Sequence, residues 1–244
     1  MFHEWHAKGS TFEARGAGPP GTPQILVGSS PAVSWGLTAL ALDQADLFRL
    51  DTADDHPGQY RVDGTWTPFA NTSNEVVLVK GGEAVHVTFA ETIFGPLVTR
   101  LVGSSSSTST STSSTSTSTS TGAQWALLAI PYARPQASSW SASLALYRAA
   151  DAASAVGEAV LGGWEFPSCN MVLGDARHGT TAYRMNGAVP VRSLSVPLGG
   201  TIAWYGNSTS VLWRGVVPAD LNPVVVGPSA GYVLSGNNAP VGPW

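Results

Sequence analysis

The chain has 244 residues and a formal net charge of −4, and only 11% of its residues are charged, against about 25% in an ordinary soluble domain. So few cations cannot form the basic face that nucleic-acid binding needs, and a single cysteine excludes both a disulfide framework and a cysteine-based zinc site within the chain. The 27 glycines and 17 prolines favour a protein rich in turns and strands over a helical bundle.

The first hundred residues show the pattern of short strands. Apolar runs with β-branched residues recur between turn residues. The pair Asp63-Gly64 tolerates the positive φ of a tight hairpin, and Gly81-Gly82-Glu83 predicts a second one. In the second hairpin, apolar and polar residues alternate as in a half-buried strand. The expected strands are 23–29, 32–38, 45–50, 59–62, 65–68, 76–80 and 84–90.

Residues 104–121 consist only of serine and threonine. Such a tract cannot bury apolar surface, so nothing offsets the entropy of ordering it. We interpret 102–123 as a disordered insert in a surface loop, in preference to an O-glycosylated segment. Residues 1–101 and 124–244 are then two parts of one domain.

Strands and two short helices are expected after the insert. Residues 124–130 and the pair 170–174 and 180–184 are predicted strands, and the alanine-rich segments 139–150 and 151–161 are predicted helices. Asp151 is the expected N-cap of the second helix, and Gly162-Gly163 is expected to end it.

The candidate chemistry is sparse when residues are taken singly. His3-Glu4-Trp5-His6 lacks the i, i+4 histidine pair and the third ligand of a helical zinc motif. No serine or aspartate spacing marks His56 or His178 as a member of a catalytic triad. We interpret Cys169, in an apolar run, as a buried small hydrophobe in preference to a nucleophile.

Two polar patterns are more specific. The carboxylates of Asp43 and Asp46, with a backbone carbonyl between them, can face one hard cation such as calcium. Asn237, in SGNNAP, either builds a turn or donates a side-chain hydrogen bond to an oxyanion in acyl transfer.

Several segments occur together in an order that resembles one family. They are HAKGSTFEARGAGPPGTPQILVGSSPAVSWGLT, DQADLF, QYRVDGTWTPF, FAETIFGPLV, GDARHGTTAYRMNGAVPVR and VVPADLNPVVVGPSAGYVLSGNNAPV. In this order the chain resembles the β subunit of penicillin acylases (penicillin amidases), which are N-terminal nucleophile hydrolases. The resemblance covers most of the chain outside the serine and threonine tract.

The resemblance implies a mechanism and a set of site residues. In the family, a serine, threonine or cysteine at the start of the β chain attacks an amide carbonyl, and its own α-amino group is the base. The oxyanion is held by a backbone N–H and an asparagine amide, which correspond here to Ala39 and Asn237. The calcium ligands correspond to Asp43, Ala45 through its carbonyl, and Asp46. The positions that line the acyl pocket are Val27, Leu37 and Cys169, where valine and leucine would give an aliphatic pocket.

The resemblance implies an α+β fold, a partial four-layer α/β/β/α arrangement with mostly antiparallel sheets. It also implies hydrolysis of a small N-acyl amide, such as a penicillin-like amide or an acyl-homoserine lactone. The family's nucleophile lies upstream of the segment that matches Met1, so we expect a fragment that needs a missing α chain or other acylase segments. The alternative is a non-catalytic remnant that binds a ligand or a partner. Members are usually periplasmic or secreted, but the sequence predicts neither a signal peptide nor a membrane span.

Overall fold

The computed structural model describes residues 2–22, 24–98, 123–134, 139–157, 160–194, 196 and 200–238. Contacts divide the chain into two compact units that interleave along the sequence. The first unit consists of Met1–Gln44, Arg134–Val191 and Gly215–Trp244, and the second of Ala45–Ala133 and Arg192–Arg214. Each unit therefore combines segments that are far apart in the sequence. The predicted insert 102–123 lies outside the described residues apart from residue 123.

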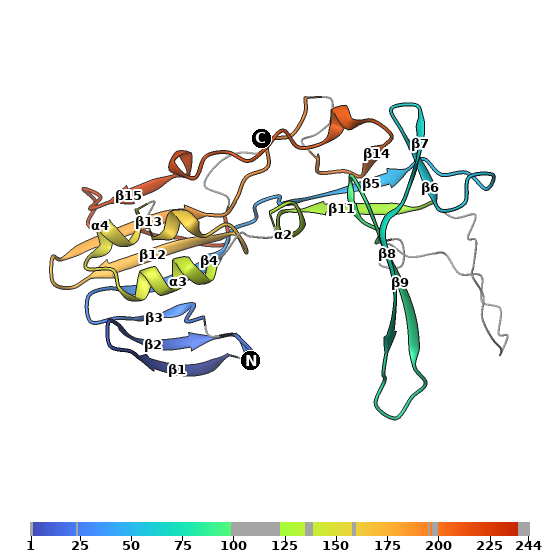
Figure 1. The fold of residues 1–244 in the computed structure, drawn as a ribbon. Coiled ribbons are helices and arrows are strands. Elements are labelled where there is room, and N and C mark those ends of the chain that lie inside the picture. Colours follow the sequence, from blue (N-terminus) through green and yellow to red (C-terminus); the bar gives the residue numbers. More distant parts are fainter. Residues whose placement is uncertain are drawn as a thin grey trace. The chain divides into compact units, whose positions relative to one another are not determined.

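The first unit is built on a seven-stranded antiparallel sheet with the strand order β1-β2-β3-β4-β12-β13-β15 (Figure 1). The long β12–β13 hairpin provides the centre of this sheet, and β4 pairs with β12 along its whole length. The strands are β1 His3–Lys8, β2 Glu13–Gly18, β3 Val27–Ser29, β4 Ser34–Ala39, β12 Cys169–Asp175, β13 Thr180–Asn186 and β15 Val224–Val226.

Helices cover one face of this sheet, which we call the helix face. They are α3 Ser139–Tyr147, α4 Ala152–Ala155 and the 3-10 turn η1 Leu161–Gly163 (Figure 1). Trp35 of β4 stacks on Tyr147 of α3 with ring centroids 5.6 Å apart. Because side chains alternate along a strand, Leu37 shares the helix face with Trp35. The main apolar core of this unit lies between the helices and this face.

The opposite face of the sheet, which we call the second face, carries polar side chains at its centre. Thr38 lies directly across from Asn170, and both alternate with residues of the helix face. Tyr183 of β13 is on the same side, as its pairing with Val172 shows. A further 3-10 turn, η4 Ala219–Leu221, precedes β15.

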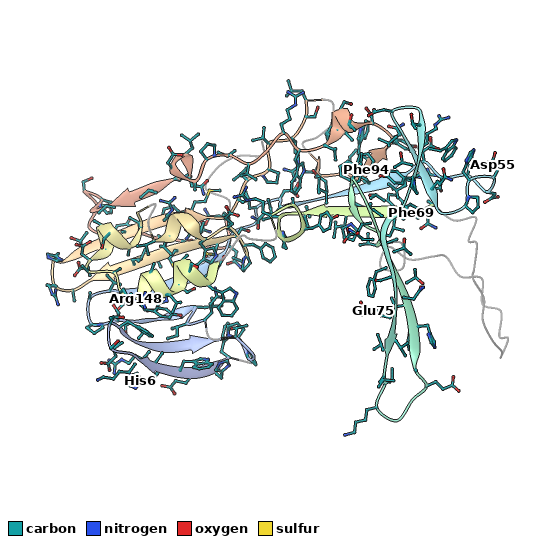
Figure 2. All side chains as sticks on the ribbon, in the orientation of Figure 1. His6, Asp55, Phe69, Glu75, Phe94 and Arg148 are labelled. Carbon is teal, nitrogen blue, oxygen red and sulfur yellow. The ribbon has the colours of Figure 1, made fainter. Side chains whose placement is uncertain are left out.

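The second unit contains three small sheets, with strand orders β11-β5-β14, β10-β9-β8 and β6-β7. Its core is aromatic: Phe48 and Phe94 are fully buried with ring centroids 5.1 Å apart, and Tyr60 stacks on Phe69 at 5.7 Å. Phe69 and Phe94 lie at the base of the β8–β9 hairpin, and Glu75 lies farther out along it (Figure 2). The elements are β5 Ala45–Leu50, β6 Gln59–Val62, β7 Thr65–Pro68, β8 Ala70–Val77, β9 Val85–Thr92, β10 Gly95–Pro96, β11 Trp125–Ala129, α2 Ile130–Ala133, β14 Trp204–Gly206 and η3 Thr209–Val211.

Among the described strands, only β14 and β5 pair in parallel, so the expectation of mostly antiparallel sheets with few helices is confirmed. The strand 45–50 and the hairpin 59–68 are confirmed with their predicted bounds. Asp63 and Gly64 have φ angles of 48° and 79°, as a two-residue hairpin turn requires.

Several predictions about helices and strands are wrong in part. The strand predicted at 23–29 covers only Val27–Ser29, the strand predicted at 76–80 forms over Ala70–Val77, and the helix predicted at 139–150 ends at Tyr147. Asp151 is the N-cap of α4 and forms a capping box with Ser154, but the helix ends at Ala155 instead of reaching residue 161. Gly157 follows the last turn and favours this early end, whereas Gly162-Gly163 belongs to η1. The strand 84–90 forms as β9 but is not half-buried, since its side chains are mostly exposed. Strands β1 and β2 were not predicted.

Candidate active site

Ala39 is the last residue of β4, and its backbone N–H points away from the neighbouring strand β12. The Leu40 N–H donates to the Ser168 carbonyl at 3.4 Å, which makes Ala39 and Cys169 a non-hydrogen-bonded pair of the antiparallel ladder. The Ala39 N–H therefore points to the side of β4 where β3 lies. Strand β3 pairs with β4 only as far as Trp35, so no described strand covers β4 opposite Ala39.

Residues 235–238 form a loop that is hydrogen-bonded to the second face of the sheet at Thr38, next to Ala39. The Thr38 hydroxyl lies 2.8 Å from the Ser235 hydroxyl and donates to the Gly236 carbonyl at 2.8 Å. The side-chain Nδ2 of Asn170 donates to the carbonyls of Gly236 at 3.3 Å and Asn238 at 3.0 Å. The 235–238 loop is thus bonded to both members of the pair next to Ala39.

The loop has an internal hydrogen bond that gives it the shape of a turn. The backbone N–H of Gly236 donates to the side-chain Oδ1 of Asn238 at 3.1 Å, a local bond typical of asparagine in turns. The Asn237 side chain, by contrast, is exposed and makes no hydrogen bond to the described residues. The turn and oxyanion interpretations of Asn237-Asn238 therefore fall on different residues: Asn238 builds the turn, and the amide of Asn237 is available as a donor.

The three residues expected to line an acyl pocket do not come together. Leu37 and Cys169 lie on the helix face, in or against the apolar core. Val27 pairs with Ala17 and lies on the second face, where 51% of its surface is exposed. Since opposite faces of a sheet point into different surroundings, the described residues do not join Val27 to Leu37 and Cys169 in one cavity.

Cys169 is buried, as expected for a small hydrophobe. Burial in this core raises the pKa of its thiol to about 12, and only a weak 3.9 Å contact from the Asn186 amide opposes this shift. The thiolate is the nucleophilic form of cysteine, so this side chain is not the attacking group of the site.

The expected calcium ligands differ in their exposure. Asp43 is exposed, whereas Asp46 is buried and paired with Arg192, whose Nε lies 3.0 Å from Oδ1 and 3.1 Å from Oδ2. The indole N–H of Trp213 also donates to Asp46. Among the described residues, no group of three or more His, Cys, Asp or Glu side chains is arranged to hold a metal ion. The Asp46 carboxylate is already neutralised by a guanidinium, and calcium binding by Asp43, Ala45 and Asp46 stays a prediction.

An acid–histidine pair was missed in the sequence. The Asp175 carboxylate lies 2.6 Å from Nδ1 of His178 and also accepts the backbone N–H groups of Arg177 and His178. The spacing D-x-x-H in a predicted turn was the available signal. No described hydroxyl or thiol bonds to the other ring nitrogen, so the pair orders the β12–β13 turn and does not complete a triad within the described part of the chain.

Comparison with known proteins identifies the family of the chain. The sequence model described as Penicillin amidase matches residues 1–244. The chain belongs to the penicillin amidase family. Similar family members include penicillin G acylase from Escherichia coli, 25% identical over 95% of this chain and 24% of that protein. An acyl-homoserine lactone acylase (QuiP) of Pseudomonas fluorescens is 30% identical over 38% of this chain and 12% of that protein.

The fold is also that of solved penicillin amidase relatives. Thermostable penicillin G acylase from Alcaligenes faecalis superimposes with a TM-score of 0.76 at 21% identity, over 98% of this chain and 39% of that one. The chain thus spans about a quarter of the length of the Escherichia coli relative. Among the described residues, none of the helices has the length and apolar character that a membrane crossing requires.

Proposed function

We propose that this chain is the oxyanion-binding part of an amide hydrolase that removes an acyl group from a small N-acyl amide. The observation that carries the proposal is the anchoring of the 235–238 loop to Thr38 and Asn170. This anchoring bonds the residues on either side of Asn237 to the end of β4 that carries Ala39, which supports the proposal that the two donors face one oxygen. Two donors converging on one oxygen are what a tetrahedral intermediate of acyl transfer needs.

In the proposed reaction, the substrate carbonyl oxygen accepts hydrogen bonds from the Ala39 N–H and the Asn237 amide. A hydroxyl or thiol at a chain N-terminus attacks the carbonyl carbon while the α-amino group of the same residue takes its proton. The C–N bond then breaks, the amine leaves with that proton, and water hydrolyses the acyl-enzyme. The attacking residue comes from acylase polypeptide outside this sequence, at the start of the β chain, and the α chain is a further proposed partner.

The proposed substrates are those that the names of the relatives suggest: a penicillin-like amide or an N-acyl-homoserine lactone. Leu37 and Cys169 on the helix face and Val27 on the second face share no cavity among the described residues, so they do not define the acyl group of the substrate.

Carboxylate products test the proposal in the chain as it is, because a carboxylate oxygen resembles the oxyanion. We expect phenylacetate or decanoate, titrated into the ¹⁵N-labelled chain, to shift the resonances of the Ala39 backbone N–H and the Asn237 side-chain amide with one saturation curve. Asn237→Ala should remove the Ala39 shift, and Asn74→Ala, a control at an exposed amide of β8, should leave it. Saturable binding that Asn237→Ala does not alter would refute the proposal, and so would the absence of any shift at Ala39.

Kinetics test the fragment part of the proposal. The isolated chain should give no burst of acyl-enzyme with a chromogenic phenylacetyl or long-chain acyl amide. A burst that Asn237→Ala abolishes would place the nucleophile within the chain. The nucleic-acid sequence upstream of Met1 gives a second test: an open frame with a glycine followed by serine, threonine or cysteine supports the proposal, whereas stop codons favour a non-catalytic remnant.

A further inference from the structure

The family resemblance assigned no role to Asn170. Its side chain nevertheless contacts Thr38, the 235–238 loop and Tyr183. It is 1% exposed, near the start of β12. Its Nδ2 bonds two carbonyls of the 235–238 loop and lies 3.3 Å from the Thr38 hydroxyl, while its Oδ1 accepts the Tyr183 hydroxyl at 2.7 Å. Every polar atom of this amide is therefore bonded.

The orientation of the Asn170 amide is determined by its partners. The carbonyls of Gly236 and Asn238 are acceptors only, so the donor nitrogen must face them. On the other side, burial, with a smaller effect of nearby Cys169, raises the pKa of Tyr183 to about 12. The tyrosine hydroxyl therefore keeps its proton at neutral pH and donates to Oδ1. A reversed amide would set oxygen against two carbonyls and lose both bonds.

The sheet register connects this amide to both donors of the proposed oxyanion site. Asn170 is the partner of Thr38 across the β4–β12 ladder, and Ala39 is the next residue along β4. On the other side, Asn170 bonds the carbonyls of the residues that flank Asn237. One rung of the sheet therefore bonds the loop that carries Asn237 next to the residue that carries the strand N–H.

We propose that Asn170 is a positioning residue, which holds Asn237 against Ala39 so that both donors reach one oxyanion. The inference rests on the proposed function, since it assigns the geometry of the same site. It predicts that loss of the Asn170 donors frees the 235–238 loop without unfolding the sheet.

The test uses Asn170→Leu, which has similar volume but no hydrogen-bonding group. Val172→Ala, a half-buried position two residues along the same strand and on the same face, is the matched control for general loss of stability. Tyr183→Phe is the second variant, because it leaves the loop bonds and removes only the donor that orients the amide. The readouts are ¹⁵N relaxation of residues 235–238, the Kd of phenylacetate and the thermal midpoint.

We expect Asn170→Leu to make the 235–238 loop mobile on the nanosecond timescale and to weaken phenylacetate binding by about tenfold or more. Tyr183→Phe should weaken binding by about two- to fivefold. Val172→Ala should lower the thermal midpoint but leave the loop rigid and the Kd unchanged. If the loop becomes mobile although the unmodified chain binds no carboxylate, the positioning role stands and the proposed function fails. A rigid loop and an unchanged Kd in Asn170→Leu would overturn the inference.

Discussion

Replacing Asp46 by asparagine should cost the second unit a large part of its stability. The side chains of Asp46 and Arg192 are only 4% and 8% exposed, and Nε of Arg192 contacts both carboxylate oxygens. Asp46→Asn keeps the shape but removes the carboxylate charge that the buried Arg192 guanidinium contacts. Breaking a buried ion pair in this way costs about 3–5 kcal/mol, which lowers the thermal midpoint of a chain of this size by roughly 6–20 °C.

Thermal and urea unfolding, each with calcium and with EDTA, would measure this effect. The loss in Asp46→Asn should persist in EDTA, because the guanidinium provides the neutralising charge. Asp43→Asn, at an exposed carboxylate in the predicted calcium pattern, is the control. If EDTA destabilises the unmodified chain and both variants remove that sensitivity, calcium binding is supported. A loss below about 1 kcal/mol in EDTA, the range of a surface ion pair, would refute the reasoning from the buried pair.

Three further predictions concern the cores and the capping box. Cys169, whose pKa is raised to about 12 by burial, should resist alkylation in the native chain at pH 8 and react after denaturation; rapid native labelling would show that the core is open. Phe48→Ala, at a fully buried ring, should cost about 3–5 kcal/mol in urea unfolding, and a loss under 1 kcal/mol would contradict this packing. The backbone N–H of Ser154 lowers the pKa of Asp151. The capping bond therefore stabilises the folded chain at pH values above the unfolded pKa, and this stabilisation is lost as the pH falls through the lower folded pKa. Asp151→Ala should therefore lower the thermal midpoint at pH 7, and its effect should diminish as the pH falls below the unfolded aspartate pKa of about 3.9; a loss that does not change with pH would argue against the cap.

Short sequence patterns correctly predicted the hairpin turn and the helix N-cap, because these features depend on residues that are close together in the chain. The turn at Asp63-Gly64 needs two positive φ angles, and this requirement is visible in two adjacent residues. The N-cap at Asp151 is likewise a local feature, since its side chain bonds the backbone N–H of Ser154 three residues on. The end of the same helix was not predicted. The composition of 151–161 favours a helix throughout, whereas Gly157, which has a low helix propensity, favours an end before it.

Long-range contacts explain most of what the sequence did not reveal. The Asp46–Arg192 pair joins residues 146 positions apart, so the sequence around Asp46 does not indicate Arg192 as its partner. The alternation in 84–90 predicts a strand correctly, but burial depends on what packs against the strand, which a local pattern does not contain. Asn170 was overlooked for the same reason, since its partners lie in the 235–238 loop and in β13.

The family resemblance supplied what single residues could not. Alone, Asn237 is an ordinary turn residue, and Ala39 has no functional side chain at all. The structure adds that the 235–238 loop is bonded to Thr38 and Asn170, next to Ala39, and the proposal that Ala39 and Asn237 act together rests on these bonds. The acyl pocket shows the opposite outcome, because alternation along the strands separates Val27 from the other two positions.

A crystal structure of the chain with bound phenylacetate would measure the central geometry directly. The account predicts one carboxylate oxygen within about 2.7–3.1 Å of both the Ala39 nitrogen and the Asn237 side-chain nitrogen, the range of an oxyanion-hole donor. A carboxylate bound elsewhere, or an Asn237 amide directed away from the Ala39 N–H, would contradict it.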